Sequence, residues 1–491
     1  MPAPLKRMTA MDATFLYLER MGQLMHVASI AIFDGPLSYE RLVADIAGRL
    51  HLIPRYKQRA VTVPLGIGHP SWEPDPQFDV RHHVIHHRLR GAGDDRQLSE
   101  LASRLFGEPL DRRRPLWEVH LIDNYQGNRS ALVSKVHHCM IDGVSGVQLM
   151  GVLFDPSPDP APPPPPTEAD LRPPPPLPSP SERVVRALRE NIATRVAAVG
   201  TVLGALRDPS AALKAVTEVV ESAQEIWRYL LMPIPPTPWN GHVSVLRRWV
   251  WATFPLHEVK AIKNRLGGTV NDVALATISG ALRRYLEAQG ENPDRVELRA
   301  ACPVNTRTSS EHLKLGNRVS AMMAPLPVGI YDPAERYRQL RTAMAQLKAR
   351  GESTHFGRML DLMDLLPPIL QRQVAWIQTQ ATPINTICTN VPGPPVSLYM
   401  QGKRIETFVP ALPLTQGIGL AFAIMSYADS LTIGMPVDPG LVPDCDILPG
   451  LLEHAYAELR ELAGIERLPP RVAPLPAERQ RRQAATSSQV A

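Results

Sequence analysis

The sequence predicts a mixed α/β protein of two domains, and three observations support this prediction. The chain has 491 residues, which is too long for one ordinary hydrophobic core. Short Val- and Ile-rich segments alternate with segments of helical periodicity on both sides of a proline-rich break. Hydrophobic residues make up 44% and charged residues 21%, as in globular chains. We expect an N-terminal domain (1–155), a linker with connecting helices (156–240), a C-terminal domain (241–465) and a disordered basic tail (466–491).

Hydrophobic periodicity and the residues that begin or end helices predict the elements of the N-terminal domain. We expect a strand over 25–33, a helix capped by Ser38, a helix closing near Gly107, paired strands over 118–123 and 131–136, and a short helix over 147–153. The helix after Ser38 must end before Pro54, because the residue before a proline disfavours the helical conformation. The second strand of the pair runs directly into two adjacent histidines, which makes its end the point of interest.

The middle of the chain is unusually rich in proline. Many of the 51 prolines fall in residues 156–180, and uninterrupted runs at 162–166 and 173–176 favour an extended, semi-rigid spacer. The helical segment that follows carries an apolar stripe at steps of three and four residues: Ile192, Val196, Val199, Leu203 and Leu206. Such a stripe usually packs on a core, although it could also lie on a membrane.

The C-terminal domain shows the same alternation of strands and helices. We expect helices over 256–266, after Thr269, over 337–347 and over 451–462, and strands over 298–302, 319–326 and 384–389, with a hairpin over 420–433. Thr269 and Asp272 have the Thr-x-x-Asp spacing of a helix cap. The sequence therefore predicts one strand-rich unit on each side of the linker.

Charge and hydropathy exclude several classes of protein. The formal charge of +5 comes from scattered Lys and Arg, so we expect no nucleic-acid groove, and weak attraction to anionic lipid or to coenzyme A phosphates stays open. No unbroken apolar run reaches the roughly 18 residues that span a bilayer. The N-terminal residues lack the apolar core of a signal peptide. We therefore expect an intracellular protein that is soluble or peripherally attached to a membrane.

The most informative motif is His137-His138-x-x-x-Asp142-Gly143, directly after an apolar run. Because histidine titrates near neutral pH, a placed histidine can act as a general base and take a proton from an alcohol that attacks an activated acyl carbon. Neighbouring strand residues face opposite sides, so one of the two histidines faces a given cavity. A thioester donor needs no protein nucleophile, and the chain has no Gly-x-Ser-x-Gly elbow. Cys139 is a candidate nucleophile, although we favour a buried structural thiol.

Metal binding is the rival use of these side chains. His137, His138 and Asp142 lack the His-x-x-x-His spacing of a helical zinc site, and the four cysteines form no Cys-x-x-Cys pair. A second group of histidines lies at positions 82, 83, 86 and 87, in a segment that reads as a solvated strand. We therefore expect no metal site.

The motif resembles the signature of the coenzyme A-dependent acyltransferase superfamily, whose members include chloramphenicol acetyltransferase and the condensation domains of nonribosomal peptide synthetases. Other segments resemble the bacterial wax ester synthase/diacylglycerol acyltransferase family: Met8 to Glu19 with Met25-His26-Val27, Pro115 to Glu118, Asn271-Asp272-Val273, and Asn390 to Pro394. These matches extend from residue 8 to about residue 460. Cys139 and Thr389 stand where relatives often carry Ala and Ser, and both changes are mild.

The resemblance implies two chloramphenicol acetyltransferase-like domains with mixed sheets flanked by helices and a tunnel at their interface. It implies His138 as the general base, which takes the hydroxyl proton and later protonates the departing thiolate, with His137, Asp142 and Gly143 in support. Asp142 would pair with an arginine, for which Arg307 is the candidate. Asn271 would either assist the developing oxyanion from the tunnel wall or cap its helix. Glu19 would either face the tunnel or lie exposed at its helix end.

The activity that the resemblance implies is transfer of a fatty acyl group from acyl-CoA to diacylglycerol, giving triacylglycerol, with long-chain alcohols as further acceptors that give wax esters. Acyl-CoA would be a co-substrate, and no permanently bound cofactor is expected. The expected location is the cytoplasm, peripheral at the inner membrane face or on lipid droplets. Two alternatives stay open: another coenzyme A-dependent acyltransferase or condensation enzyme of lipid or polyketide metabolism, and an inactive lipid-binding homologue.

Overall fold

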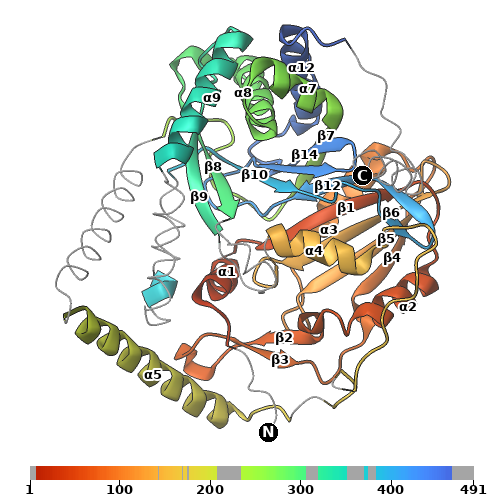
Figure 1. The fold of residues 1–491 in the computed structure, drawn as a ribbon, viewed down its shortest axis with the longest axis vertical. Helices are drawn as coiled ribbons and strands as arrows, with labels where there is room; N and C mark the ends of the chain where they lie inside the picture. Colours follow the sequence, from red (N-terminus) through yellow and green to blue (C-terminus); the bar gives the residue numbers. More distant parts are fainter. Residues whose placement is uncertain are drawn as a thin grey trace, which may run out of the picture.

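Two six-stranded mixed sheets form the centre of the molecule, and helices cover their outer faces (Figure 1). The computed structural model describes residues 7–20, 22–141, 143–168, 170–173, 176–206, 234–305, 319–350, 370–373 and 383–466. Two large clusters of buried apolar side chains lie on the two sheets, and a third brings Trp249 of the second sheet against the first sheet.

The first sheet has the strand order β11-β12-β1-β6-β5-β4. Its strands are β1 (His26–Phe33), β4 (Val84–Arg88), β5 (Trp117–Tyr125), β6 (Arg129–His137), β11 (Tyr399–Met400) and β12 (Lys403–Ala411). Neighbouring strands are antiparallel except β4 and β5, which are parallel. A separate two-stranded ribbon consists of β2 (Gln58–Val61) and β3 (Ser71–Pro74).

Helices cover both faces of the first sheet. They are α1 (Ala10–Arg20), α2 (Tyr39–Arg49), α3 (Asp95–Gly107) and α4 (Gly143–Leu153). Short 3-10 turns lie at Pro54–Lys57, Pro64–Gly66 and Val80–His82. Leu42 and Ile46 of α2 and Met150 of α4 pack on one face, and Leu98 and Leu105 of α3 pack on the other. The predicted cap of α2 is confirmed, because Ser38 accepts a hydrogen bond from the amide of Arg41 at 3.5 Å.

The second sheet has the order β7-β14-β13-β10-β8-β9, in which β10 is parallel to both β13 and β8. Its strands are β7 (Arg248–Pro255), β8 (Leu298–Asn305), β9 (Val319–Leu326), β10 (Thr386–Pro392), β13 (Phe422–Tyr427) and β14 (Ser430–Val437). Its helices are α7 (Leu256–Leu266), α8 (Val270–Ala288), α9 (Pro333–Arg350) and α12 (Leu448–Leu462), with 3-10 turns at Pro293–Arg295 and Cys445–Ile447. Nearly every residue of α8 after its first turn is buried, so α8 is the central helix of this half.

Strand β12 joins the two halves, because it lies late in the chain and yet pairs with β1 of the first sheet. It also contacts β14 of the second sheet, and there the backbones come close at Gly434: a Cβ atom at this position would collide with the carbonyl oxygen of Pro410. A second junction lies between α3 and β7. Ser99 Oγ donates to the carbonyl of Trp249 at 2.7 Å, and the amide of Trp249 donates to Ser103 Oγ at 2.8 Å.

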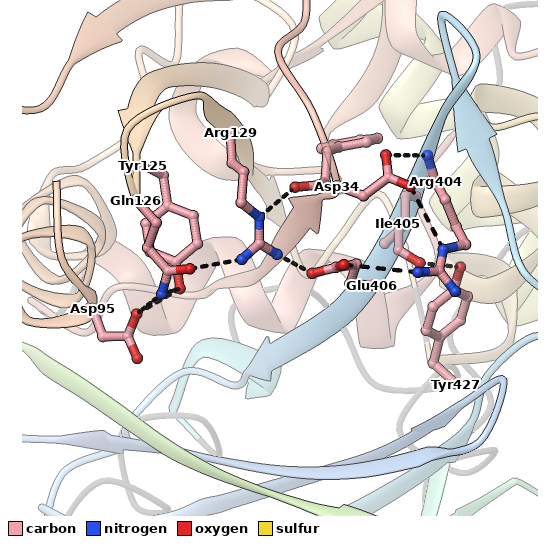
Figure 2. A network of polar contacts seen from close by, with 10 residues as sticks. Asp34, Asp95, Tyr125, Gln126, Arg129, Arg404, Ile405, Glu406 and Tyr427 are labelled. Carbon is pink, nitrogen blue, oxygen red and sulfur yellow. Dashed lines mark hydrogen bonds and ion pairs between the residues drawn. The ribbon is translucent and has the colours of Figure 1, made fainter. Parts of the chain in front are cut away.

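A network of polar side chains fixes β12 on the first sheet (Figure 2). Arg129 of β6 donates to the carbonyl of Phe33 at 3.0 Å and forms an ion pair with Glu406 of β12. The backbone amide of Arg404 donates to Asp34, just after β1, at 2.9 Å. Tyr427 of β13 donates to the carbonyl of Ile405 at 3.0 Å, which ties β12 to the second sheet as well. Side chains from β6, from β13 and from the residue after β1 thus converge on β12.

Several predicted elements are confirmed and one interpretation is wrong. The strand at 25–33, the helix closing at Gly107, the strand pair before the histidines and the hairpin after residue 420 are all present. In the predicted linker (156–240), the described residues of 156–179 carry no helix or strand, and a predicted connecting helix follows as α5 (Pro180–Leu206). The histidine-rich segment is not a solvated strand throughout. His83 is buried, and its ring stacks on the ring of Trp117 with 4.4 Å between centroids. Nδ1 of His83 also forms a hydrogen bond with the backbone carbonyl of Trp117 at 2.8 Å. The domain boundaries at 155, 241 and 465 stay predictions.

A candidate active site at the end of strand β6

Strand β6 ends at His137, and its register with β1 places His137 opposite His26. The backbone continues the pairing for one more residue, because the amide of His138 donates to the carbonyl of Met25 at 2.8 Å. A turn follows, in which the amide of Met140 donates to the carbonyl of His137 at 2.9 Å. The two histidines therefore lie on a backbone held by the sheet on one side and by a turn on the other.

His137 is fully buried, and Nδ1 is the ring nitrogen that has a hydrogen-bond partner. Nδ1 accepts a hydrogen bond from the amide of Cys139 at 3.1 Å. A neutral ring that accepts at Nδ1 carries its proton on Nε2, and Nε2 lies 3.6 Å from Oε1 of Glu19. The ring of His137 thus links the turn that follows His138 to a carboxylate on α1.

Glu19 lies in the last turn of α1, and its side chain is only 8% exposed. Nε of Arg112 donates to Oε2 of Glu19 at 2.7 Å, and Arg112 also donates to the carbonyl of Leu16 at 3.1 Å. Burial raises the pKa of Glu19, but its contacts with His137 and with the guanidinium of Arg112 outweigh burial and hold the pKa at about 2. The alternative of an exposed glutamate at the helix end is therefore wrong, and Glu19 is ionised beside the motif.

His138 is half-buried, and its ring stacks on Phe15 of α1 with 4.1 Å between centroids and 20° between planes. Phe15 and Glu19 are four residues apart, so they lie on one face of the helix. This one face of α1 contacts both histidines, one through an aromatic ring and one through a carboxylate. Packing of this kind restricts the rotamers of His138, which is a requirement for a positioned proton acceptor.

A buried basic group lies under the same end of the sheet. Lys135 is 1% exposed, donates to the carbonyls of Leu105 and Glu108 at 3.0 Å each, and pairs with Glu118 at 2.9 Å. Burial raises the pKa of Glu118, but His120 and Lys135 hold it at about 2. Burial, reinforced by the charge of Lys135, lowers the pKa of His26 to about 3. His26 is therefore neutral at physiological pH and belongs to the framework.

Asn271 and Asn390 belong to two separate segments that resemble the family, and the structure places the two side chains in contact. Asn390 on β10 donates through Nδ2 to Oδ1 of Asn271 in the first turn of α8 at 2.9 Å. Asn271 is not the helix cap, because Thr269 is the N-cap and forms a capping box with Asp272. The capping alternative for Asn271 is thus wrong, and the predicted capping role of Asp272 is confirmed.

These segments converge with the histidine motif through apolar packing. Helix α4, which begins at Gly143, contacts β10, and Val391 beside Asn390 packs on the cluster that contains Cys139, Met140 and Ile141. Cys139 itself is buried, and burial raises the pKa of its thiol well above the ordinary value. A thiol in this state is a poor nucleophile, which supports the structural role expected for it.

An apolar cavity lies between α2, α4 and the strands β5 and β6. Its lining is formed by apolar and aromatic side chains except for Ser134, and includes Ile46, Leu50, Trp117, Val136, Leu149 and Leu153. The cavity opens beneath the helix that directly follows the motif. The cavity has room for about one water molecule, so it carries no substrate assignment by itself.

Two predicted participants lie outside the described residues, namely Asp142 and Arg307, so their pairing stays a prediction. The interface tunnel and the catalytic roles of His138, His137, Gly143, Asn271 and Glu19 also stay predictions. Within the described ranges, no group of three or more His, Cys, Asp or Glu side chains has a metal-binding arrangement. None of the helices in those ranges is long and apolar enough to cross a membrane.

Sequence reasoning missed Phe15 and Arg112. Helical spacing within the Met8–Glu19 segment could have placed Phe15 on the face of Glu19, because the two are four residues apart. No local pattern relates Arg112 to Glu19, which lies 93 residues earlier in the chain. Only the folded arrangement reveals that contact.

The fold places the chain in a broad class of two-sheet acyl-transfer and condensation proteins. It superimposes on the first condensation domain of the calcium-dependent antibiotic synthetase with a TM-score of 0.59 at 17% identity, covering 94% of this chain and 97% of that one. It also superimposes on the wax ester synthase/diacylglycerol acyltransferase from Marinobacter aquaeolei VT8 with a TM-score of 0.63 at 25% identity, covering 94% and 100%. The chloramphenicol acetyltransferase-like fold implied by the resemblance is therefore confirmed.

Sequence comparison identifies the family. The model of the wax ester synthase/diacylglycerol acyltransferase catalytic domain matches residues 8–274, and the model of the C-terminal domain of the same family matches residues 315–460. A probable diacylglycerol O-acyltransferase of Mycobacterium tuberculosis is 32% identical over 468 residues, which cover 93% of this chain and 96% of that relative. A putative one of Mycobacterium bovis matches equally well. The chain belongs to the wax ester synthase/diacylglycerol acyltransferase family.

Proposed function

We propose that this protein is an acyl-CoA-dependent O-acyltransferase that esterifies diacylglycerol to triacylglycerol, with long-chain alcohols as further acceptors. The observation that carries the proposal is the position of His138, held by the sheet and by Phe15 beside the buried group of His137 and Glu19. The names of the relatives support diacylglycerol as acceptor, and the family name supports both acceptors.

In the proposed mechanism, His138 accepts the proton of the acceptor hydroxyl as its oxygen attacks the thioester carbonyl. The tetrahedral intermediate collapses to the ester, the carbon–sulfur bond breaks, and the proton passes from His138 to the departing thiolate. Asn271, positioned by Asn390, is the polar group that we assign to the developing oxyanion. The substrate supplies the activated carbonyl, so the reaction needs neither a metal nor a covalent enzyme intermediate.

The lipid character of both substrates is supported by the family name, which refers to wax esters and to diacylglycerol. Acyl-CoA is a co-substrate in this proposal. A starter condensation domain of the same fold, 12% identical, is described in complex with an eight-carbon acyl-CoA. Since diacylglycerol resides in membranes, we further propose peripheral contact with the inner membrane face or with lipid droplets.

The test uses purified protein, labelled palmitoyl-CoA and either diacylglycerol or hexadecanol, followed by separation of the lipids. We expect labelled ester from the wild type and a loss of at least about 100-fold in His138→Ala, the usual contribution of general base catalysis. The matched control is His86→Ala, an exposed histidine paired with Asp123. Unchanged turnover in His138→Ala would contradict the base assignment.

The same assay separates the alternatives. Release of free coenzyme A without triacylglycerol or wax ester would point to another acceptor within the same superfamily. Absence of coenzyme A release with every acceptor would point to an inactive lipid-binding protein. A thiol reagent suits this measurement, because all four cysteines of the protein are buried.

A further inference from the structure

The contact between Phe15 and His138 is a face-to-face stack and not an edge contact. The two ring centroids lie 4.1 Å apart, and the ring planes are inclined by only 20°. Phe15 is half-buried and packs against the large apolar cluster of the first half. The phenyl ring is therefore held over one face of the imidazole.

Helix α1 is attached to its surroundings next to Phe15, which fixes the position of the phenyl ring. Leu16 and Tyr17, the two residues that follow Phe15, are both buried. Arg112 donates to the carbonyl of Leu16 at 3.1 Å. The hydroxyl of Tyr17 forms a hydrogen bond with Nδ1 of His69 at 3.2 Å. The stack on His138 thus depends on a helix that is held from two sides.

A phenyl ring interacts differently with the two protonation states of an imidazole. The face of the phenyl ring carries a partial negative charge, so it attracts a cation that lies within about 6 Å of the ring centroid. In the proposed mechanism, His138 becomes an imidazolium cation when it accepts the hydroxyl proton of the acceptor. The stack is therefore stronger in the transition state than in the resting enzyme, and an interaction of this kind accelerates a reaction.

The other charges around the motif balance one another. The charged groups that act on Cys139, the residue after His138, are two carboxylates and two guanidiniums: Asp12, Glu19, Arg55 and Arg112. On the sheet, the charge of Lys135 is paired with Glu118 at 2.9 Å, and His26 is neutral. Asp142 lies outside the described residues and is the same in every variant compared below. Because these formal charges sum to zero, the phenyl ring can contribute measurably to the protonation of His138.

We propose that Phe15 is a positioning residue whose ring face favours the protonated form of His138 during acyl transfer, and this inference rests on the proposed function. The stack keeps the imidazole in one rotamer and stabilises the positive charge that forms on it. Burial alone has the opposite effect, because an apolar cover that excludes water disfavours the charged form of histidine. The sign of the effect therefore distinguishes this role from simple packing.

The test is a titration of the His138 ring by NMR in the full chain labelled with carbon-13 histidine, with the signal assigned by its loss in His138→Ala. Phe15→Leu keeps an apolar cover and removes the ring face. We expect it to lower the titration midpoint of His138 by about 0.5 pH unit, and Phe15→Tyr to keep the midpoint. The matched control is Phe78→Leu, which removes a similar stack on His83, with 5.4 Å between centroids and 23° between planes.

Kinetics with palmitoyl-CoA and hexadecanol provide the second readout. We expect Phe15→Leu to lower kcat roughly 2- to 5-fold with little change in KM, and Phe15→Tyr to restore it. The acid limb of the pH profile of kcat/KM should move to lower pH by the same ~0.5 unit, because the base must be neutral to act. Phe15→Met is a second variant without a ring, and circular dichroism checks that each variant is folded.

The two readouts separate the two proposals. If the wild type forms no ester and releases no coenzyme A at any pH, the proposed function fails, while the titration still reports on the stack. A titration midpoint that is unchanged or higher in Phe15→Leu would overturn the inference. An equal shift of the midpoint in Phe15→Tyr or in Phe78→Leu would also overturn it, because the effect would then not come from the ring face of Phe15.

Discussion

At the scale of single residues, the site depends on a chain of contacts from Arg112 through Glu19 to His137 and on to the amide of Cys139. Each contact fixes the next group: the guanidinium orients the carboxylate, the carboxylate faces Nε2, and Nδ1 holds the turn. His138 lies between His137 and Cys139, so its backbone is set by this chain. We therefore regard Glu19 as a positioning residue.

Replacement of Glu19 by glutamine tests this role. A hydrogen bond to a charged group contributes about 1.5–3 kcal/mol, so we expect kcat to fall roughly 10-fold or more with little change in KM. Steady-state kinetics with palmitoyl-CoA measures kcat and KM separately. Glu40→Gln is the control, because Glu40 is 72% exposed in its pair with Arg81. Equal kinetics for the two variants would show that Glu19 does not position the motif.

The same carboxylate makes stability depend on pH. The pKa of Glu19 is about 2 in the folded protein against an ordinary 4.5, so its ionised form stabilises the fold fully above pH 4.5 and progressively less as the pH falls toward 2. Glu118 has the same dependence. We expect urea unfolding between about pH 5 and about pH 3 to show a shallower loss of stability in Glu19→Gln than in the wild type. Parallel curves would contradict the depressed pKa.

At the scale of elements, the sequence pattern predicts those helices and strands that are set by interactions between residues close in sequence. The capping box of α8, the N-cap of α2 and the strand β1 all follow from side chains close in sequence. The burial of His83 does not, because its partner Trp117 lies 34 residues away. Strand β12 also escaped prediction, since its first half carries charges and Pro410 interrupts its pattern. The same holds for the site: the sequence pattern identifies the two histidines, but it does not predict the contact of Arg112 with Glu19.

The capping box offers a test at this scale. Thr269 Oγ accepts from the amide of Asp272 at 3.2 Å and donates to its carboxylate at 2.8 Å. We expect Thr269→Ala to lower the free energy of unfolding by about 1 kcal/mol. Thr269→Ser should keep most of this stabilisation, because serine retains the hydroxyl. Urea denaturation measures both. Equal losses in the two variants would mean that the hydroxyl is not the stabilising group.

At the scale of the whole molecule, the two sheets form one structural unit because β12 of the first sheet also packs against β13 and β14 of the second. It pairs with β1, contacts β14, and is bound by Arg129 and Tyr427 from opposite sides (Figure 2). The order of strands in such an arrangement depends on pairings between residues nearly 400 positions apart, which no local periodicity encodes. The two-domain division of the sequence therefore understates how closely the halves are connected.

This connection predicts joint unfolding. Trp72 and Trp117 are buried in the first half, Trp239 is buried in the second, and Trp249 lies at the junction with α3. Variants that keep only Trp72 and Trp117, or only Trp239, should report the same denaturation midpoint as circular dichroism. Gly434→Ala should lower both midpoints together, because the added methyl group meets the carbonyl of Pro410 and lowers the free energy of unfolding by about 1–3 kcal/mol. Two separate transitions, or a shift in one half alone, would contradict joint unfolding of the two halves.

The late position of β12 also has a consequence for biosynthesis. Until residue 411 has left the ribosome, one edge of β1 has no partner strand, although β6 on its other side has long been made. An open strand edge is a template for aggregation. A nascent chain of this protein would therefore need protection, and a message truncated shortly before β12 would yield a product prone to precipitate rather than a smaller active enzyme.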